Sequence, residues 1–150
     1  MAKKRPLVQE VSYGLYEPFE SEGKALPVLS GDGAFTARVP AVVGQEFGYI
    51  LKVKHGRGMR LAFEIDHPGI PDADGVVREP FRGEVFVRNS DFDFFLGDAL
   101  WEPLEHMLGE WTLTCRLADK VVAKRTFEVV PQANLEGDPD GWDWDALPMQ

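Results

Sequence analysis

The feature that most constrains this chain is the alternation of apolar and polar side chains in residues 111–117. The apolar positions of this run are Trp111, Leu113, Cys115 and Leu117. A short turn at residues 118–120 leads into a second alternating run at residues 121–130. Successive side chains of a strand point to opposite faces of a sheet, so a period of two predicts strands with one buried face. The two runs predict a hairpin whose apolar face, around Trp111, packs between two sheets.

Three further segments show the same period. They are residues 11–16, 47–54 and 59–66, and a glycine-rich turn at residues 55–58 joins the last two. Weaker strands are predicted at residues 35–39 and 84–88. Proline and glycine, 11 and 15 in number, interrupt the chain frequently, as is typical of an all-β sandwich or barrel.

Little helix is expected. Residues 98–108 offer a helical turn at most, because Asp98 could cap a helix but Pro103 interrupts its interior. Two long stretches, residues 18–33 and 67–83, are predicted to be irregular. Loops of this length in a compact domain are either functional or mobile.

Composition narrows the classes of partner. The 150 residues carry a formal net charge of −9, which disfavours broad binding to nucleic acid or to an anionic membrane. The single cysteine excludes a disulfide within the chain. No apolar run is long enough for a membrane helix or a signal peptide, so we expect a cytoplasmic protein.

Residues 63–130 carry short motifs in a particular order. They are His-Pro-Gly at residues 67–69, Trp-Glu-Pro at 101–103, Leu-Gly-Glu-Trp at 108–111 and Thr-Phe-Glu-Val at 126–129. This order resembles a family of short bacterial and archaeal proteins known only as a domain of unknown function. The resemblance covers roughly residues 8–130 and implies an immunoglobulin-like β-sandwich of about seven antiparallel strands. It implies no catalytic residue.

The expected organisation has three parts. Residues 1–7 form a flexible N-terminus, residues 8–130 form the sandwich, and residues 131–150 form an acidic tail without a basic residue. Trp142 and Trp144 lie among carboxylates in that tail. A calcium loop is disfavoured there, because glycine and glutamate do not stand at the required positions. The two indoles are predicted to anchor in a partner or to fold back on the sandwich.

His67 is the candidate site residue in the first long loop. Asp66, Asp72 and Asp74 lie near it in the sequence, so a carboxylate–imidazole site is conceivable. The favoured interpretation is structural, with the imidazole hydrogen-bonded to the backbone of its own loop. If the loop has a functional role, we predict that His67, Asp72 and Asp74 contribute to binding. No catalytic residue, metal or cofactor is predicted.

Two other groups have favoured structural interpretations. Cys115 shares the apolar face of Trp111 and is predicted to be a small buried hydrophobe rather than a nucleophile. Asp91 and Asp93 are predicted to lie on the wet face of an edge strand, with Phe92, Phe94 and Phe95 pointing inward.

The sequence thus favours a non-enzymatic binding or protein-interaction module that uses the long loop or the tail. One alternative is a metal-dependent enzyme that uses the loop of His67. Another is a structural protein that self-associates through a sheet edge. A weaker alternative is a nucleic-acid mimic built on acidic surface rows.

Overall fold

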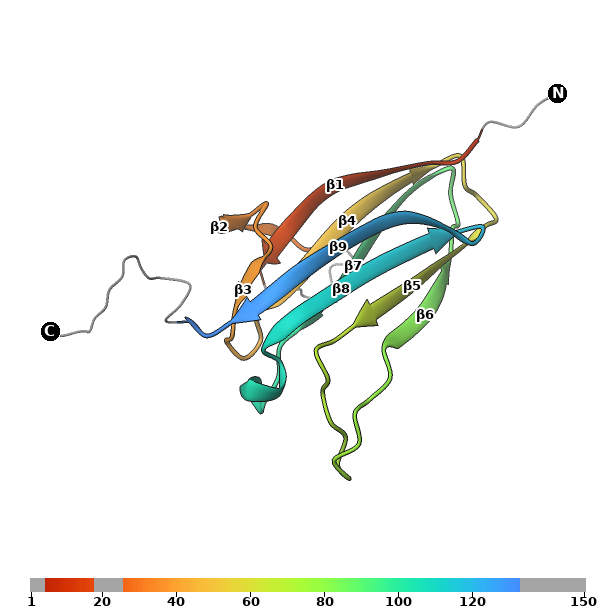
Figure 1. Ribbon diagram of the computed structural model, residues 1–150. Helices are drawn as coiled ribbons and strands as arrows, with labels where there is room; N and C mark the ends of the chain where they lie inside the picture. The colour runs from red at the N-terminus through yellow and green to blue at the C-terminus, as the bar shows by residue number, and fades with distance from the viewer. Residues whose placement is uncertain (1–4, 18–25, 133–150) are drawn as a thin grey trace, which may run out of the picture.

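The computed structural model describes residues 5–17 and 26–132, which form two facing β-sheets (Figure 1). One sheet has four strands in the order β2-β1-β4-β7, and the other has five in the order β3-β9-β8-β5-β6. The strands are β1 Leu7–Tyr16, β2 Leu29–Ala34, β3 Arg38–Pro40, β4 Glu46–Lys54, β5 Arg60–Asp66, β6 Phe81–Phe86, β7 Asp91–Ala99, β8 Gly109–Leu117 and β9 Lys120–Val130. The predicted β-sandwich is confirmed.

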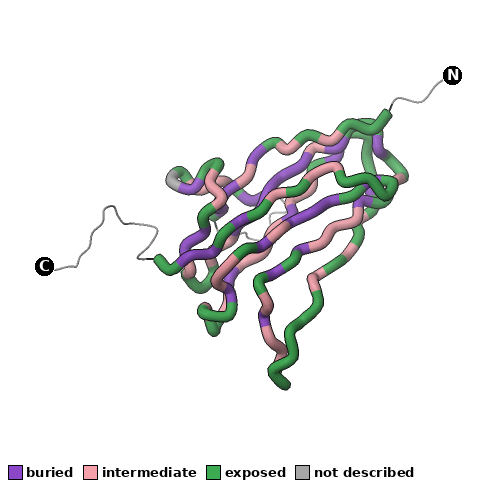
Figure 2. Tube along the Cα trace, in the orientation of Figure 1, coloured by how far each residue is buried: buried purple, intermediate pink, exposed green. Residues whose placement is uncertain are grey.

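Trp111 lies in the core, as the alternation predicts. Its side chain is fully buried between the sheets, and its ring centroid is 5.3 Å from that of Phe47 on β4. Figure 2 shows the buried residues concentrated along the strands in the middle of each sheet. Tyr49 adds a polar link between the sheets, because its hydroxyl donates a 2.9 Å hydrogen bond to the carbonyl oxygen of Leu113.

The inner face carries one ion pair between the sheets. Arg125 on β9 donates from Nε and an Nη atom to both carboxylate oxygens of Glu10 on β1, at 2.7 and 2.8 Å. The guanidinium carbon of Arg125 lies 3.4 Å from the ring centroid of Tyr13. The side chain of Arg125 is 31% exposed and that of Glu10 is 26% exposed. This partly buried, bidentate pair links β9 of one sheet to β1 of the other.

The strand predicted at residues 35–39 is confirmed only from Arg38 onward, because residues 35–37 cross between the sheets. β2 ends at Ala34 in the four-stranded sheet, and β3 begins at Arg38 in the five-stranded sheet. Phe35 between them has a φ of 56°, a left-handed conformation that a continuous strand excludes. β3 then pairs with β9 in parallel, whereas all the other strand pairs of the described residues are antiparallel. The described residues form nine strands rather than about seven, because β7 and β2 add to the predicted runs, and β2 lies mostly within residues 18–33, which were predicted to be irregular.

β7 corrects two further predictions. Asp98 caps no helix, because it lies within this strand. The expectation of a helical turn at most in residues 98–108 is confirmed, since the helix described there is the single turn η2 (Leu104–His106). Phe95 points outward rather than inward and packs edge-on against Tyr16 at 5.0 Å. The prediction of an edge strand with outward aspartates is confirmed, since Asp91 and Asp93 both pair with Lys52.

Gly48 marks a close approach in the four-stranded sheet. It has a φ of +153° and pairs with Gly14 on one side and Gly97 on the other. A Cβ added at Gly48 would collide with the carbonyl oxygen of Leu96. Only glycine fits this position without displacing the backbone of the neighbouring strand.

None of the described helical segments has the length and apolarity needed to cross a bilayer.

Candidate binding surface at the loop end

One end of the sandwich gathers the long connections. β4 begins opposite the last residue of β7, β5 ends opposite Thr112 near the start of β8, and β8 begins opposite Val129 near the end of β9. The β3–β4, β5–β6 and β7–β8 connections therefore lie together, beside the point where β9 ends (Figure 1). We call this the loop end. The opposite end, which carries the β4–β5, β6–β7 and β8–β9 turns, is the turn end.

Aromatic rings extend the core into the loop end. The ring centroid of Trp111 lies 6.5 Å from that of Trp101 and 6.4 Å from that of His67. Phe81 lies 5.1 Å from His67 and 6.4 Å from Trp101, again between centroids. Trp111 is fully buried, whereas Trp101 and Phe81 are half-buried. The cluster thus continues from the core to the surface.

His67 fixes the base of the β5–β6 loop. Its Nδ1 accepts hydrogen bonds from the backbone N–H groups of Gly69 and Ile70, at 3.1 and 3.0 Å. Because Nδ1 accepts, the proton of the neutral ring is assigned to Nε2, which then donates to the carbonyl oxygen of Glu79 at 3.1 Å. The prediction that this imidazole bonds its own loop is confirmed. Metal binding by His67 would have to break one of these contacts.

The rest of the loop is ordered by backbone contacts. Ile70 is buried and its carbonyl oxygen accepts from the N–H of Arg78. Asp72 orders the tip, because its Oδ1 accepts from the N–H groups of Asp74 and Val76 at 2.8 and 3.0 Å. Asp74 lies exposed at this tip. Within the predicted site, Asp72 therefore acts on the loop backbone, and the carboxylate of Asp74 faces solvent.

Two exposed valines follow the tip. Val76 and Val77 keep 61% and 60% of their exposure. A loop that is anchored at its base and apolar at its tip presents contact area at a low ordering cost. The sequence did not single out these valines, because their exposure depends on how the loop is held.

The β7–β8 connection lies beside the β5–β6 loop at the loop end (Figure 1). The indole N–H of Trp111 donates to the carbonyl oxygen of Met107 at 2.9 Å, which ties the turn η2 to the core. The N–H of Gly44 donates to the carbonyl oxygen of Leu100, so a hydrogen bond joins the β3–β4 connection to the β7–β8 connection. That connection exposes Val42 and Val43, at 37% and 54%.

Asp98 is a titratable group at this end whose pKa is shifted. It lies opposite Phe47 in the β4–β7 ladder, and directly opposed residues share a face, so its side chain is on the inner side. Burial raises the pKa of the Asp98 carboxyl above its usual value, and the nearby charge of Glu46 acts in the same direction. A hydrogen bond from the N–H of Ala99 partly offsets the shift.

The thiol of Cys115 lies buried in the core. Burial raises the pKa of the Cys115 thiol to about 11, despite the hydrogen bond from Tyr49, so the thiol stays protonated near neutral pH. The predicted core role of Cys115 is confirmed. In residues 5–17 and 26–132, no three His, Cys, Asp or Glu side chains come together as a metal site would require.

The predicted tail residues Trp142 and Trp144 lie outside the described residues. The description ends at Gln132, two residues after β9 reaches the loop end. The two surfaces favoured by the sequence, the loop after His67 and the C-terminal segment, thus start from the same end of the sandwich.

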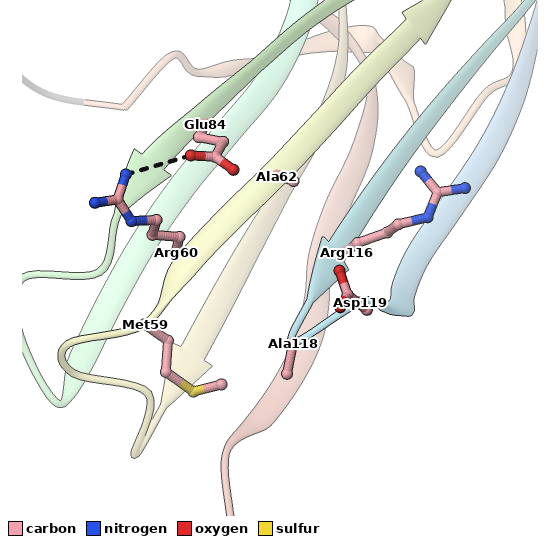
Figure 3. Close-up of a pocket in the computed structure, with 7 residues that line it drawn as sticks. All are labelled: Met59, Arg60, Ala62, Glu84, Arg116, Ala118 and Asp119. Atoms are coloured by element: carbon pink, nitrogen blue, oxygen red, sulfur yellow. Dashed lines mark hydrogen bonds and ion pairs between the residues drawn. The ribbon is translucent and has the colours of Figure 1, made fainter.

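A hollow that the sequence did not reveal lies on the outer face of the five-stranded sheet, towards the turn end (Figure 3). Ala62 forms its floor, with Arg116 on β8 opposite it on one side and Glu84 on β6 on the other. Glu84 accepts from Arg60 at 3.4 Å. The alternation predicts which residues face outward, but only the register across three strands brings these side chains together.

The profile of Domain of unknown function (DUF3859) matches residues 4–129. The chain belongs to this family. The match confirms the resemblance seen in residues 8–130. The DUF3859 profile ends at residue 129, so the C-terminal segment lies outside the matched region. No curated protein matches the chain.

Solved structures support the fold of the DUF3859 chain. An immunoglobulin-like protein from Pseudomonas aeruginosa is similar with a TM-score of 0.67 and 22% identity, over 87% of this chain and 100% of that one. This likeness shows an immunoglobulin-like fold. An alkylpurine DNA glycosylase from Pseudomonas fluorescens, bound to DNA containing an abasic site analogue, has a TM-score of 0.38 and 10% identity, over 63% of this chain and 28% of that one. The second likeness carries no argument about function.

Proposed function

We propose that this DUF3859 chain is a non-enzymatic binding module that takes a protein partner on its loop end. The observation that carries the proposal is the continuous aromatic cluster from buried Trp111 to half-buried Trp101 and Phe81. Such a cluster offers a rigid aromatic anchor at the surface, which is the kind of group that dominates binding energy in protein interfaces. Sandwiches commonly use loops at one end for recognition, since the sheets hold them in place.

The β5–β6 loop supplies the second part of the surface. His67 fixes its base through three backbone contacts, and Asp72 orders its tip. Val76 and Val77 add exposed apolar side chains just after the loop tip. We place the C-terminal segment, with Trp142 and Trp144, in the same role, because β9 ends at this end of the sandwich.

Site-specific photo-crosslinking in the native host tests the proposal. A photoreactive residue at Val76 is compared with one at Val121, which is similarly exposed at 53% but lies at the turn end. We expect one defined protein adduct from position 76 and none from position 121. The same adducts from both positions, or none from position 76, would contradict a partner at the loop end.

Removal of residues 131–150 then separates the two contributions. If the C-terminal segment contacts the partner, the adduct at position 76 weakens in the truncated chain. An unchanged adduct would assign the binding to the loops alone.

A further inference from the structure

β6 is the edge strand on which the inference rests. It closes the five-stranded sheet, and no segment of residues 5–17 and 26–132 pairs with its outer side (Figure 1). Its six residues pair with β5 without any register shift, so the edge is regular. A regular edge presents unpaired N–H and C=O groups that can accept another strand.

The other three described edges are protected. β7 carries Asp91, Asp93 and Asp98 and no basic residue, so a second β7 strand would meet like charge. β3 has three residues and ends in Pro40, which has no N–H to donate. β2 contains two glycines and pairs with β1 through an irregular register. β6 is the described edge that lacks such a barrier.

The charges of β6 are complementary to themselves. Arg82 and Glu84 lie on its outer face, one residue to either side of Gly83. An antiparallel strand of the same sequence centred on Gly83 places each Arg82 opposite a Glu84, and each Glu84 opposite an Arg82. Opposite charges directly across a strand pair stabilise it, and the arrangement holds for both halves of a two-fold interface.

We propose that β6 pairs with β6 of a second copy of this chain, in the register centred on Gly83. The two five-stranded sheets then form one continuous sheet across a two-fold axis. This inference goes beyond the proposed binding role and needs no ligand, so either can fail without the other.

Apolar side chains add to the charge pairs. In this register half-buried Phe81 lies opposite the partner's Val85 on the inner face, and Phe86, which is 55% exposed, lies opposite the partner's Pro80 on the outer face. Each of these contacts covers apolar surface that the single chain leaves in water. Because six residues bury a small area, the association is expected to be weak and dependent on concentration.

Charge reversal on the full chain provides the test. Arg82→Glu leaves two acidic residues on the edge, and Glu84→Arg leaves two basic residues. Within one chain Arg82 pairs with half-buried Glu64 and exposed Glu79, and Glu84 pairs with exposed Arg60, at 3.3 to 3.6 Å. Exposed pairs contribute little to stability, so both variants should fold, and thermal melting checks this.

Sedimentation velocity over roughly 5–500 µM chain, a range suited to weak interfaces, measures the association. We expect the wild type to approach twice the mass of one chain at the upper concentrations. Each single variant should weaken self-association at least about tenfold, and an equimolar mixture should recover the dimer, because the acidic edge then meets the basic one. Arg116→Glu, on the same face but away from the edge, serves as the control and should leave the dimer unchanged.

Three results would overturn the proposal. They are a monomeric wild type over the whole range, a dimer that both charge reversals leave intact, and a mixture of the two folded variants that stays monomeric.

Discussion

At the turn end, short turns connect the strands, whereas at the loop end the long connections are anchored in the core. His55, Ala118 and Asp119 adopt positive φ values in the turns, and the β4–β5 and β6–β7 turns bond directly to each other. At the loop end, by contrast, the side chains of His67 and Trp111 hold backbone groups of the β5–β6 and β7–β8 connections. Local backbone geometry thus sets one end, and contacts made by buried side chains set the other.

The difference has a functional meaning. Connections held by buried side chains can be long and still present a fixed surface, which is what a recognition surface requires. Tight turns offer less contact area. Because the two ends are held in different ways, we expect them to respond differently to mutation.

Trp111→Ala should have the largest effect. It removes a fully buried indole from the point where the core meets the loop end, and truncation of a core aromatic typically costs ~3–5 kcal/mol of unfolding free energy. Chemical denaturation measures the loss. Trp142→Ala, outside the predicted sandwich, is the control and should leave stability almost unchanged. Equal losses for the two would contradict the division between sandwich and tail.

His67→Ala should come next and act on the loop end. It leaves the N–H groups of Gly69 and Ile70 and the carbonyl of Glu79 without this partner, at a cost of about 2–3 kcal/mol. Hydrogen exchange should speed up in residues 69–79 and stay slow in the β8–β9 hairpin. His55→Asn at the turn end is the matched control, since asparagine tolerates the positive φ of 62° and the change should be near neutral.

Asp98→Asn should have a smaller effect that depends on pH. The pKa of Asp98 is raised in the folded chain, so the ionised carboxyl costs stability above that pKa, and the cost fades as the pH falls through it. The asparagine variant should therefore melt slightly higher than the wild type near pH 7, and the advantage should shrink towards about pH 4. Thermal melting over this range measures it. An advantage that grows on acidification would show that the pKa is lowered instead.

Ala118→Gly should have the smallest effect and act at the turn end. Ala118 has a φ of 52°, which glycine adopts without steric cost, while glycine loses more backbone entropy on folding. The two terms nearly cancel, so we expect a change of a few tenths of a kcal/mol, towards higher stability. A large loss on this substitution would show that the turn end also depends on side-chain contacts.

Much of the fold was predictable because it follows from local periodicity. The alternation around Trp111 and in residues 47–54 and 59–66 assigned buried faces that the structure confirms. The start of the strand predicted at residues 35–39 was wrong, since the turn at Phe35 and the parallel pairing of β3 with β9 depend on strands far away in the sequence. Asp98 was misplaced for the same reason, because its pairing with β4 overrides its preference for a helix start.

The candidate surface was predictable only in outline. The sequence indicated His67 and its loop, and it favoured backbone bonding over metal binding. It gave no sign that Trp101 and Phe81 join His67 and Trp111 in one cluster, because those four residues come from different connections and strands.

By itself, the sequence determined the inward faces of the strands at residues 47–54, 59–66 and 111–117, the tight turns that join strongly alternating runs, and the family of the chain. The strand faces and turns follow from neighbours along the chain. The tertiary structure decided which strands lie side by side, that the long connections share one end, and that β6 is left as an open edge. The physical reason is that strand order and register are set by packing between distant segments, which a period of two does not specify.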